Sequence, residues 1–202
     1  MPIRIPLEIH AITIIVSETK IVEKPIRVGP RVETHRERVT THREVPPRQD
    51  RPSFDQALLY SNNVLRQADI QFYVQSFDTA KEEIPGGGDR VDSNGFIYLI
   101  GRFPAQSGLS VLLVGDFERS DLGGEAIEAR SACIVCALGH PGTGKALAHE
   151  LAHLLGLQHV ARDTPRAAWN LMYEALRAGD ELTAAQVSAA RSSRSAQSFS
   201  AQ

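Results

Sequence analysis

The sequence of 202 residues lacks the features that define several common protein classes. It has only two cysteines, which cannot form a disulfide framework, so its stability has to come from an apolar core or a bound metal. It has no strong excess of one charge, with 22 basic and 24 acidic residues, which argues against nucleic acid or an anionic membrane as main partner. No apolar run approaches the roughly 18 residues that a membrane-spanning helix needs.

The N-terminal segment also lacks the features of a secretory signal peptide. Arg4, Glu8 and His10 lie before or inside its best apolar stretch, and no cleavage site of small residues follows. We therefore expect a soluble protein, either cytoplasmic or exported by a non-classical route. Its hydrophobic content of 42% is sufficient for one sizeable core.

The sequence does contain several segments typical of β-strands. Residues 7–22 are rich in Ile, Val and Thr, which predicts one long strand or a hairpin. Residues 24–51 hold eight Lys or Arg against four acids, which predicts a solvated basic loop or a surface hairpin. Further strands are predicted at residues 70–77, 109–114, 123–130 and 132–138. The segments at 109–114 and 132–138 are apolar throughout and should be buried, whereas 123–130 is more polar and suits an edge.

Helices are predicted from apolar periodicity and from capping residues. Ser53 and Gln56 have the spacing of a capping box, and Thr183 and Gln186 repeat it before the last helix. Two more helices are predicted near residues 96–103 and 144–155. Residues 192–202 contain five serines and little to bury, which predicts a disordered tail.

The chemically informative segment runs from His149 to His159. On a helix, His149 and His153 project from one face, one turn apart, and can bind the same metal ion, with Glu150 beside them. Gly156 can end this helix in the left-handed conformation, and the chain can then bring His159 to the same ion.

Three neutral imidazoles leave one coordination position open on a tetrahedral zinc ion. Structural zinc sites are normally closed by four protein ligands, so an open position is typical of a catalytic site. The pattern therefore predicts one catalytic Zn²⁺ with Glu150 as the general base of a hydrolase.

The segment from His149 to His159 resembles the zinc signature of the metzincin metallopeptidases. Those enzymes carry a methionine turn after the third histidine, and Asn170-Leu171-Met172-Tyr173 resembles the matrixin form of that turn. The resemblance implies an α+β, zincin-like fold: a twisted mixed β-sheet packed on two helices, with the zinc helix at the floor of the cleft. It implies one catalytic domain over residues 1–191, divided at residue 159 into an N-terminal subdomain and a small, mainly helical C-terminal subdomain.

By this resemblance the protein is a zinc-dependent peptidase, and we expect an endopeptidase that acts on peptide or protein substrates. Met172 would support the site, and the segment that begins at Tyr173 would wall a substrate pocket. The polar strand that carries Gly124 and Ala126 would pair with an extended peptide through backbone hydrogen bonds. Neither nucleic acid nor a membrane is expected as a partner, and the oligomeric state is left open. Val160, after the third histidine, indicates no particular subfamily.

Two other functions remain open. The same histidines could form a zinc-bearing binding module without turnover. The stretch from Gly139 to Lys145 nearly matches a phosphate-binding loop, although Ala146 replaces the Ser or Thr that would bind magnesium. Cys133 and Cys136 have the spacing of a redox pair, but on a strand they point to opposite faces and are predicted to be buried hydrophobic residues.

Overall fold

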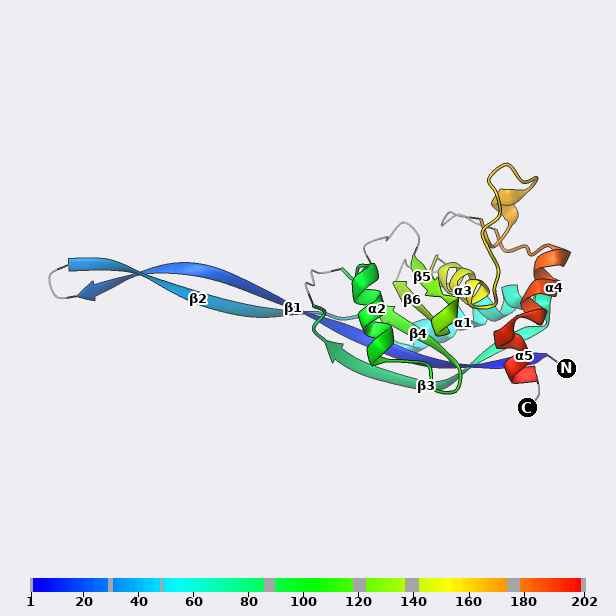
Figure 1. Cartoon of the computed structure of the whole chain (residues 1–202), viewed down its shortest axis with the longest axis horizontal. Coiled ribbons are helices and arrows are strands. Elements are labelled where there is room, and N and C mark those ends of the chain that lie inside the picture. Colours follow the sequence, from blue (N-terminus) through cyan, green and yellow to red (C-terminus); the bar gives the residue numbers. More distant parts are fainter. Residues whose placement is uncertain are drawn as a thin grey trace.

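The computed structural model describes residues 2–28, 31–47, 49–85, 90–117, 123–136, 142–173 and 179–200. A mixed β-sheet runs through the body (Figure 1), with β1 parallel to β3 on one edge and to β4 on the other. β6 continues the sheet parallel to β4, and β5 closes it antiparallel to β6. The strands are β1 Ile3–Val28, β2 Arg31–Val45, β3 Ile70–Glu82, β4 Leu109–Val114, β5 Gly124–Ile127 and β6 Ala132–Cys136.

β1 continues beyond the body and forms a long two-stranded arm with β2 (Figure 1). Ile14 pairs with Val45 on one side and with Glu82 on the other, so beyond this residue β1 has only β2 beside it among the described strands. The predicted first strand is therefore present but longer than expected. Two alternatives were predicted for the basic segment, a loop and a surface hairpin. The hairpin is found over most of its length, because its residues pair in register with β1, and the loop is wrong there.

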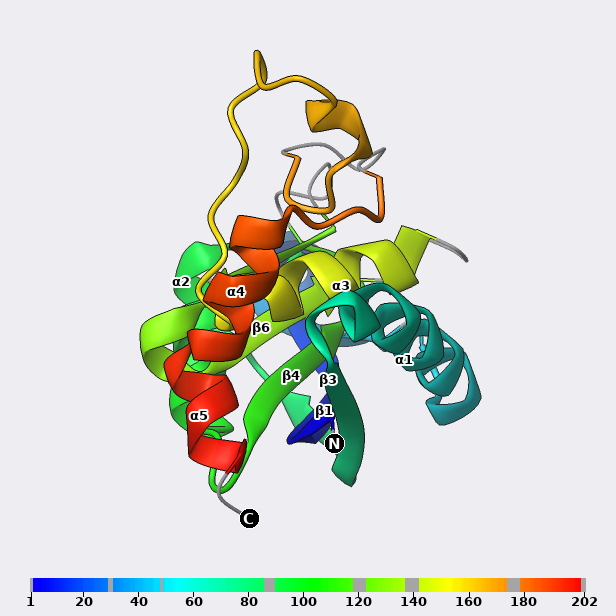
Figure 2. The same cartoon turned by 90° about the vertical axis from the view of Figure 1, so that its right-hand side faces the viewer.

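Helices cover both faces of the sheet. α1 Arg51–Leu65 and α3 Gly142–Leu154 pack side by side on one face (Figure 2), and α2 Ser93–Arg102 covers the other. β4 is apolar throughout because both of its faces are buried. Leu113 faces the core under α1 and α3, whereas Leu112 faces the core under α2. The predicted α+β architecture is thus observed.

The start of α1 corrects one prediction. Asp50, not Ser53, is the N-cap: its carboxylate accepts a hydrogen bond from the backbone N–H of Ser53 at 2.9 Å. Pro52, inside the first turn, has no N–H to lose there, so the helix can begin at Arg51.

The C-terminal segment is helical. α4 Ala184–Ser192 has the predicted capping box of Thr183 and Gln186, and α5 Arg194–Ser200 follows it. The prediction of a disordered tail from residue 192 is therefore wrong for the described residues. The small side chain of Ala196 is fully buried in the core, and the Ser195 hydroxyl donates to the Leu154 carbonyl at 3.1 Å. No helix in the described ranges is long and apolar enough to cross a membrane.

A buried carboxylate on β1 fixes the connection between α2 and β4. Glu8 accepts hydrogen bonds from the backbone N–H groups of Gln106 and Ser107 and from the Ser107 hydroxyl. Burial raises the pKa of Glu8, but these donors together lower it below the usual glutamate value. The ionised side chain therefore stabilises the fold at neutral pH, and this contribution is lost as the pH falls through the lowered pKa.

We expect Glu8→Gln to reduce the free energy of unfolding at pH 7 by about 1–3 kcal/mol, because one carboxylate acceptor becomes a donor that faces N–H groups. The difference from wild type should shrink in acid, where Glu8 is itself protonated. Urea unfolding at several pH values tests this, with Glu83→Gln, at an exposed position, as the control. A pH-independent difference would contradict the assignment.

Candidate metal centre

The zinc-binding pattern lies on α3 and on the turn that follows it. α3 presents His149 and His153 on one side, one helical turn apart. α3 ends at Leu154, and Gly156 in the turn that follows has a φ of 80°, the left-handed conformation predicted for it. The N–H of Gly156 donates to the carbonyl of His153 at 2.9 Å, and that of Leu157 donates to Ala152 at 3.0 Å, which is a Schellman motif.

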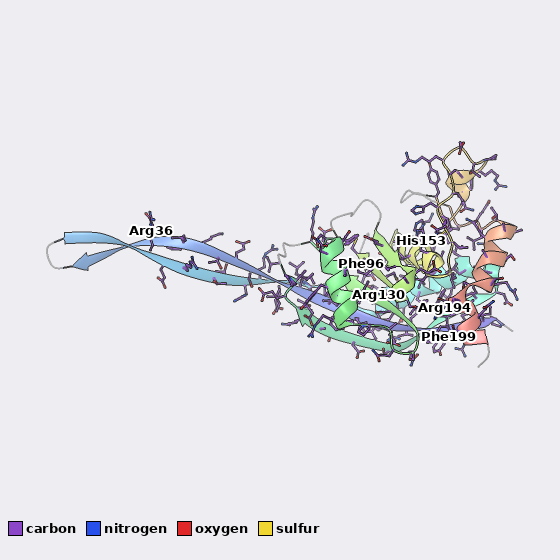
Figure 3. All side chains as sticks on the ribbon, viewed as in Figure 1. Arg36, Phe96, Arg130, His153, Arg194 and Phe199 are labelled. Carbon is purple, nitrogen blue, oxygen red and sulfur yellow. The ribbon has the colours of Figure 1, made fainter. Side chains whose placement is uncertain are left out.

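The turn brings the third histidine back to the first two. The Nε2 atoms of His149, His153 and His159 lie 3.1 Å from one another in each of the three pairs. The site lies in the body, far from the arm that carries Arg36, as the position of His153 shows (Figure 3). The structure thus brings together the three residues that the sequence predicted as ligands.

Backbone carbonyls orient two of the three rings. The Nδ1 of His149 is 2.8 Å from the carbonyl oxygen of Leu171, and the Nδ1 of His153 is 2.8 Å from that of Leu157. Because a carbonyl oxygen can only accept, each Nδ1 carries the proton and donates it. The neutral rings therefore present the lone pairs of their Nε2 atoms toward one another, as metal-binding histidines do.

Zinc suits this donor set. Three nitrogens at about 2.0–2.1 Å from a tetrahedral zinc ion would lie about 3.3 Å apart, close to the separations found here. Among the described residues the cluster holds three imidazole nitrogens and no thiolate or carboxylate, which also matches a zinc site that keeps one position open.

The rings are held in the neutral state that a metal requires. Burial lowers the pKa of His149, and burial together with the neighbouring His149 lowers the pKa of His153 to about 4. At neutral pH both rings are therefore uncharged and able to bind a cation without first losing a proton.

Glu150 is almost completely buried beneath β5. Burial, and secondarily the charge of Glu125, raises the pKa of Glu150 to about 8. Gly124 on β5 makes room for it: a Cβ at this position would lie 2.9 Å from the Glu150 Cγ and 2.5 Å from the Ile134 carbonyl oxygen. Gly124, predicted as a substrate-binding residue, thus also shapes the position of Glu150.

Three further residues were predicted for the site: Met172, Ala126 and Tyr173. Met172 is fully buried in the core shared with α3, and its carbonyl accepts from the N–H of Val160 at 3.0 Å. Ala126 lies half-buried on β5, the edge strand next to β6. Tyr173 is half-buried after Met172, but the rest of the predicted pocket wall, residues 174–176, lies outside the described residues.

The two cysteines and the described end of the phosphate-binding pattern lie within a strand and a helix, respectively. Residues 139–141 of the phosphate-binding pattern lie outside the described part, whereas Lys145 is within α3 and forms an ion pair with Asp180 at 3.5 Å. Cys133 and Cys136 are buried as free thiols in the cores on opposite faces of the sheet, as predicted.

The sequence did not identify the groups that orient the histidines. The carbonyls of Leu157 and Leu171 are backbone atoms, for which no side-chain pattern exists. Asn170 was noted only as part of the methionine segment, yet its side chain is buried and hydrogen-bonded. The one sequence signal for this contact is a polar residue, Asn170, between the apolar residues Trp169 and Leu171.

Comparison with known proteins gives a shared fold. No protein-family model and no curated protein matches the sequence. The solved structure of archaemetzincin from Methanopyrus kandleri matches 71% of this chain and 89% of its own, with 15% identity and a TM-score of 0.51. A chain from a chaperone–substrate complex matches 75% of this chain and 32% of its own, with 14% identity and a TM-score of 0.44. The chain thus has a fold similar to that of archaemetzincin.

We expect Gly124→Ala to displace Glu150 and to destabilise the protein by about 1–3 kcal/mol, because the added methyl group overlaps with Ile134 and Glu150. Thermal unfolding measures the loss of stability. The variant Gly101→Ala is the control, since nothing lies within 4 Å of a Cβ at that exposed helical position. Equal stability of the two variants would show that β5 does not pack on Glu150 as described.

Proposed function

We propose that this protein is a zinc-dependent peptidase, and specifically an endopeptidase. The observation that carries the proposal is the convergence of three Nε2 atoms beside a buried glutamate, directly under an edge strand. These are the groups that peptide hydrolysis needs: a metal site, a proton acceptor and a surface that can align a peptide.

His149, His153 and His159 would hold the zinc ion. Zinc bound there would supply a Lewis acid that polarises the scissile carbonyl and makes a water molecule easier to deprotonate. Leu171 and Leu157 would keep the first two imidazoles in the required tautomer through their carbonyl oxygens. His159 would complete the set from outside the helix.

Glu150 would act as the general base. Its carboxylate would take the proton of the attacking water and deliver it to the amine that leaves. Its burial disfavours the ionised form, which a cation bound by the neighbouring imidazoles would favour again. The burial also limits the rotamers of Glu150, since Gly124 lies against its Cγ.

β5 would align the substrate. It is the last strand of the sheet, and β6 is its only partner among the described strands, so its outer edge could pair with an extended peptide. Gly124 and Ala126 would lie along that peptide, and Tyr173 would contribute to the pocket wall. Binding along an edge needs no free chain terminus, which favours cleavage within a chain over removal of terminal residues.

Metal content and cleavage together test the proposal. The purified protein should bind about one zinc ion per chain and cleave an unstructured protein such as casein, and a chelator should abolish cleavage until zinc is restored. Zinc binding without cleavage of any member of a peptide library would overturn the proposal in favour of a binding module. A protein that binds no zinc would overturn it altogether.

Glu150→Gln should lower kcat by about 10²–10⁴-fold while zinc stays bound, because the variant keeps the three imidazoles but loses the proton acceptor. Casein cleavage and metal analysis of the same preparation measure both properties. Glu18→Gln, on the exposed arm, is the matched control and should retain full activity. Unchanged kcat in Glu150→Gln would exclude Glu150 as the base.

A further inference from the structure

A pair of side-chain amides, of which Asn170 is buried and Gln186 is half-buried, joins the methionine segment to α4. The Nδ2 of Asn170 donates to the Oε1 of Gln186 at 2.8 Å, and the Nε2 of Gln186 donates back to the Oδ1 of Asn170 at 3.1 Å. The two residues are 16 positions apart in the sequence, so their contact ties two separate elements together.

Backbone donors fix the orientation of both amides. The N–H of Met172 donates to the Oδ1 of Asn170, and the N–H of Thr183 donates to the Oε1 of Gln186, each at 2.9 Å. Turning either amide by half a turn would place an NH₂ group against a backbone N–H. Only one arrangement of the pair therefore places every donor opposite an acceptor.

The amide pair lies next to the Leu171 carbonyl, the group that orients His149. Asn170 precedes Leu171, whose carbonyl accepts from the Nδ1 of His149, and Asn170 also holds the N–H of Met172 on the far side of that carbonyl. The Leu171–Met172 peptide group, which carries that carbonyl, is thus hydrogen-bonded to the Asn170 side chain.

A second set of hydrogen bonds, between backbone groups, also holds this segment. The N–H of Leu171 donates to the carbonyl of Glu181 at 2.9 Å, and the N–H of Glu181 donates to the carbonyl of Trp169 at 3.0 Å. These backbone bonds fix the distance between the two passes of the chain, whereas the N–H of the Leu171–Met172 peptide itself is held by the Asn170 side chain.

We propose that Asn170 and Gln186 are positioning residues for the metal site. They act through the Leu171 carbonyl, which they hold where it fixes the tautomer and direction of the His149 imidazole. The catalytic consequence rests on the proposed function, whereas the placement of the ring is a property of the protein with or without it.

The state of the His149 ring is the first measurement. Long-range ¹H–¹⁵N NMR of metal-free protein should find the proton of His149 on Nδ1 in wild type. In Gln186→Ala and Asn170→Ala the proton should distribute between both nitrogens, since the carbonyl acceptor is released. Gln186→Ala is the milder change and keeps the test valid if Asn170→Ala does not fold.

Zinc affinity is the second measurement, made by competition with a chelator. Loss of a group that orients a metal ligand weakens binding by about 10–100-fold, and we expect a loss in this range for both variants. Asn170→Asp keeps the acceptor for the backbone N–H of Met172 and the side-chain NH₂ of Gln186 but loses the donor to the Gln186 Oε1, so it should recover only part of the affinity.

Asn62→Ala is the matched control. Asn62 also makes two hydrogen bonds to backbone, to the N–H and carbonyl of Phe72, but it joins α1 to β3 away from the histidines. It should lower the melting temperature without changing the tautomer of His149 or the zinc affinity. The proposal is overturned if Asn170→Ala and Gln186→Ala resemble this control. Absence of zinc binding in wild type would reject the proposed function, while the NMR comparison would still decide the positioning role.

Discussion

The Nε2 atoms of three imidazoles lie 3.1 Å from one another, and the rest of the site is arranged around this constraint. Lone pairs at this separation repel unless a cation or a shared proton lies between them. The Schellman turn at Gly156 and the carbonyls of Leu157 and Leu171 hold the rings together in spite of that repulsion. The fold therefore keeps ready a site whose electrostatics a divalent cation satisfies.

The two cores of the protein give this site a rigid base. α3 packs against the sheet through one face, and the same core includes Met172 from the methionine segment and Ala196 from α5. Elements far apart in the sequence are thus packed around α3. Close packing of this kind limits small displacements of a side chain, and catalysis depends on positions held to fractions of an ångström.

The parts that local patterns determine could be predicted from the sequence. The zinc helix, its end at Gly156, the buried strands and the cap of α4 each follow from the identity and spacing of neighbouring residues. The apolar run of β4 indicated burial on both faces, and helices do cover both. The clustering of the histidines followed from helical geometry and one glycine.

The parts that depend on distant contacts could not be predicted. The choice between a loop and a hairpin for the basic segment depends on β1 continuing beside it, and the serine-rich tail becomes helical because Ala196 finds a place in the core. The ring acceptors are backbone carbonyls, and the Asn170–Gln186 pair joins two elements whose approach no local pattern encodes.

The most direct test of the metal site is X-ray absorption spectroscopy at the zinc edge of the zinc-loaded protein. We predict a first shell of nitrogen and oxygen atoms at about 2.0–2.1 Å, with the multiple-scattering pattern of three imidazoles and one further light atom. A shell that contains sulfur, or one without three imidazoles, would contradict the assignment of His149, His153 and His159 as the ligands.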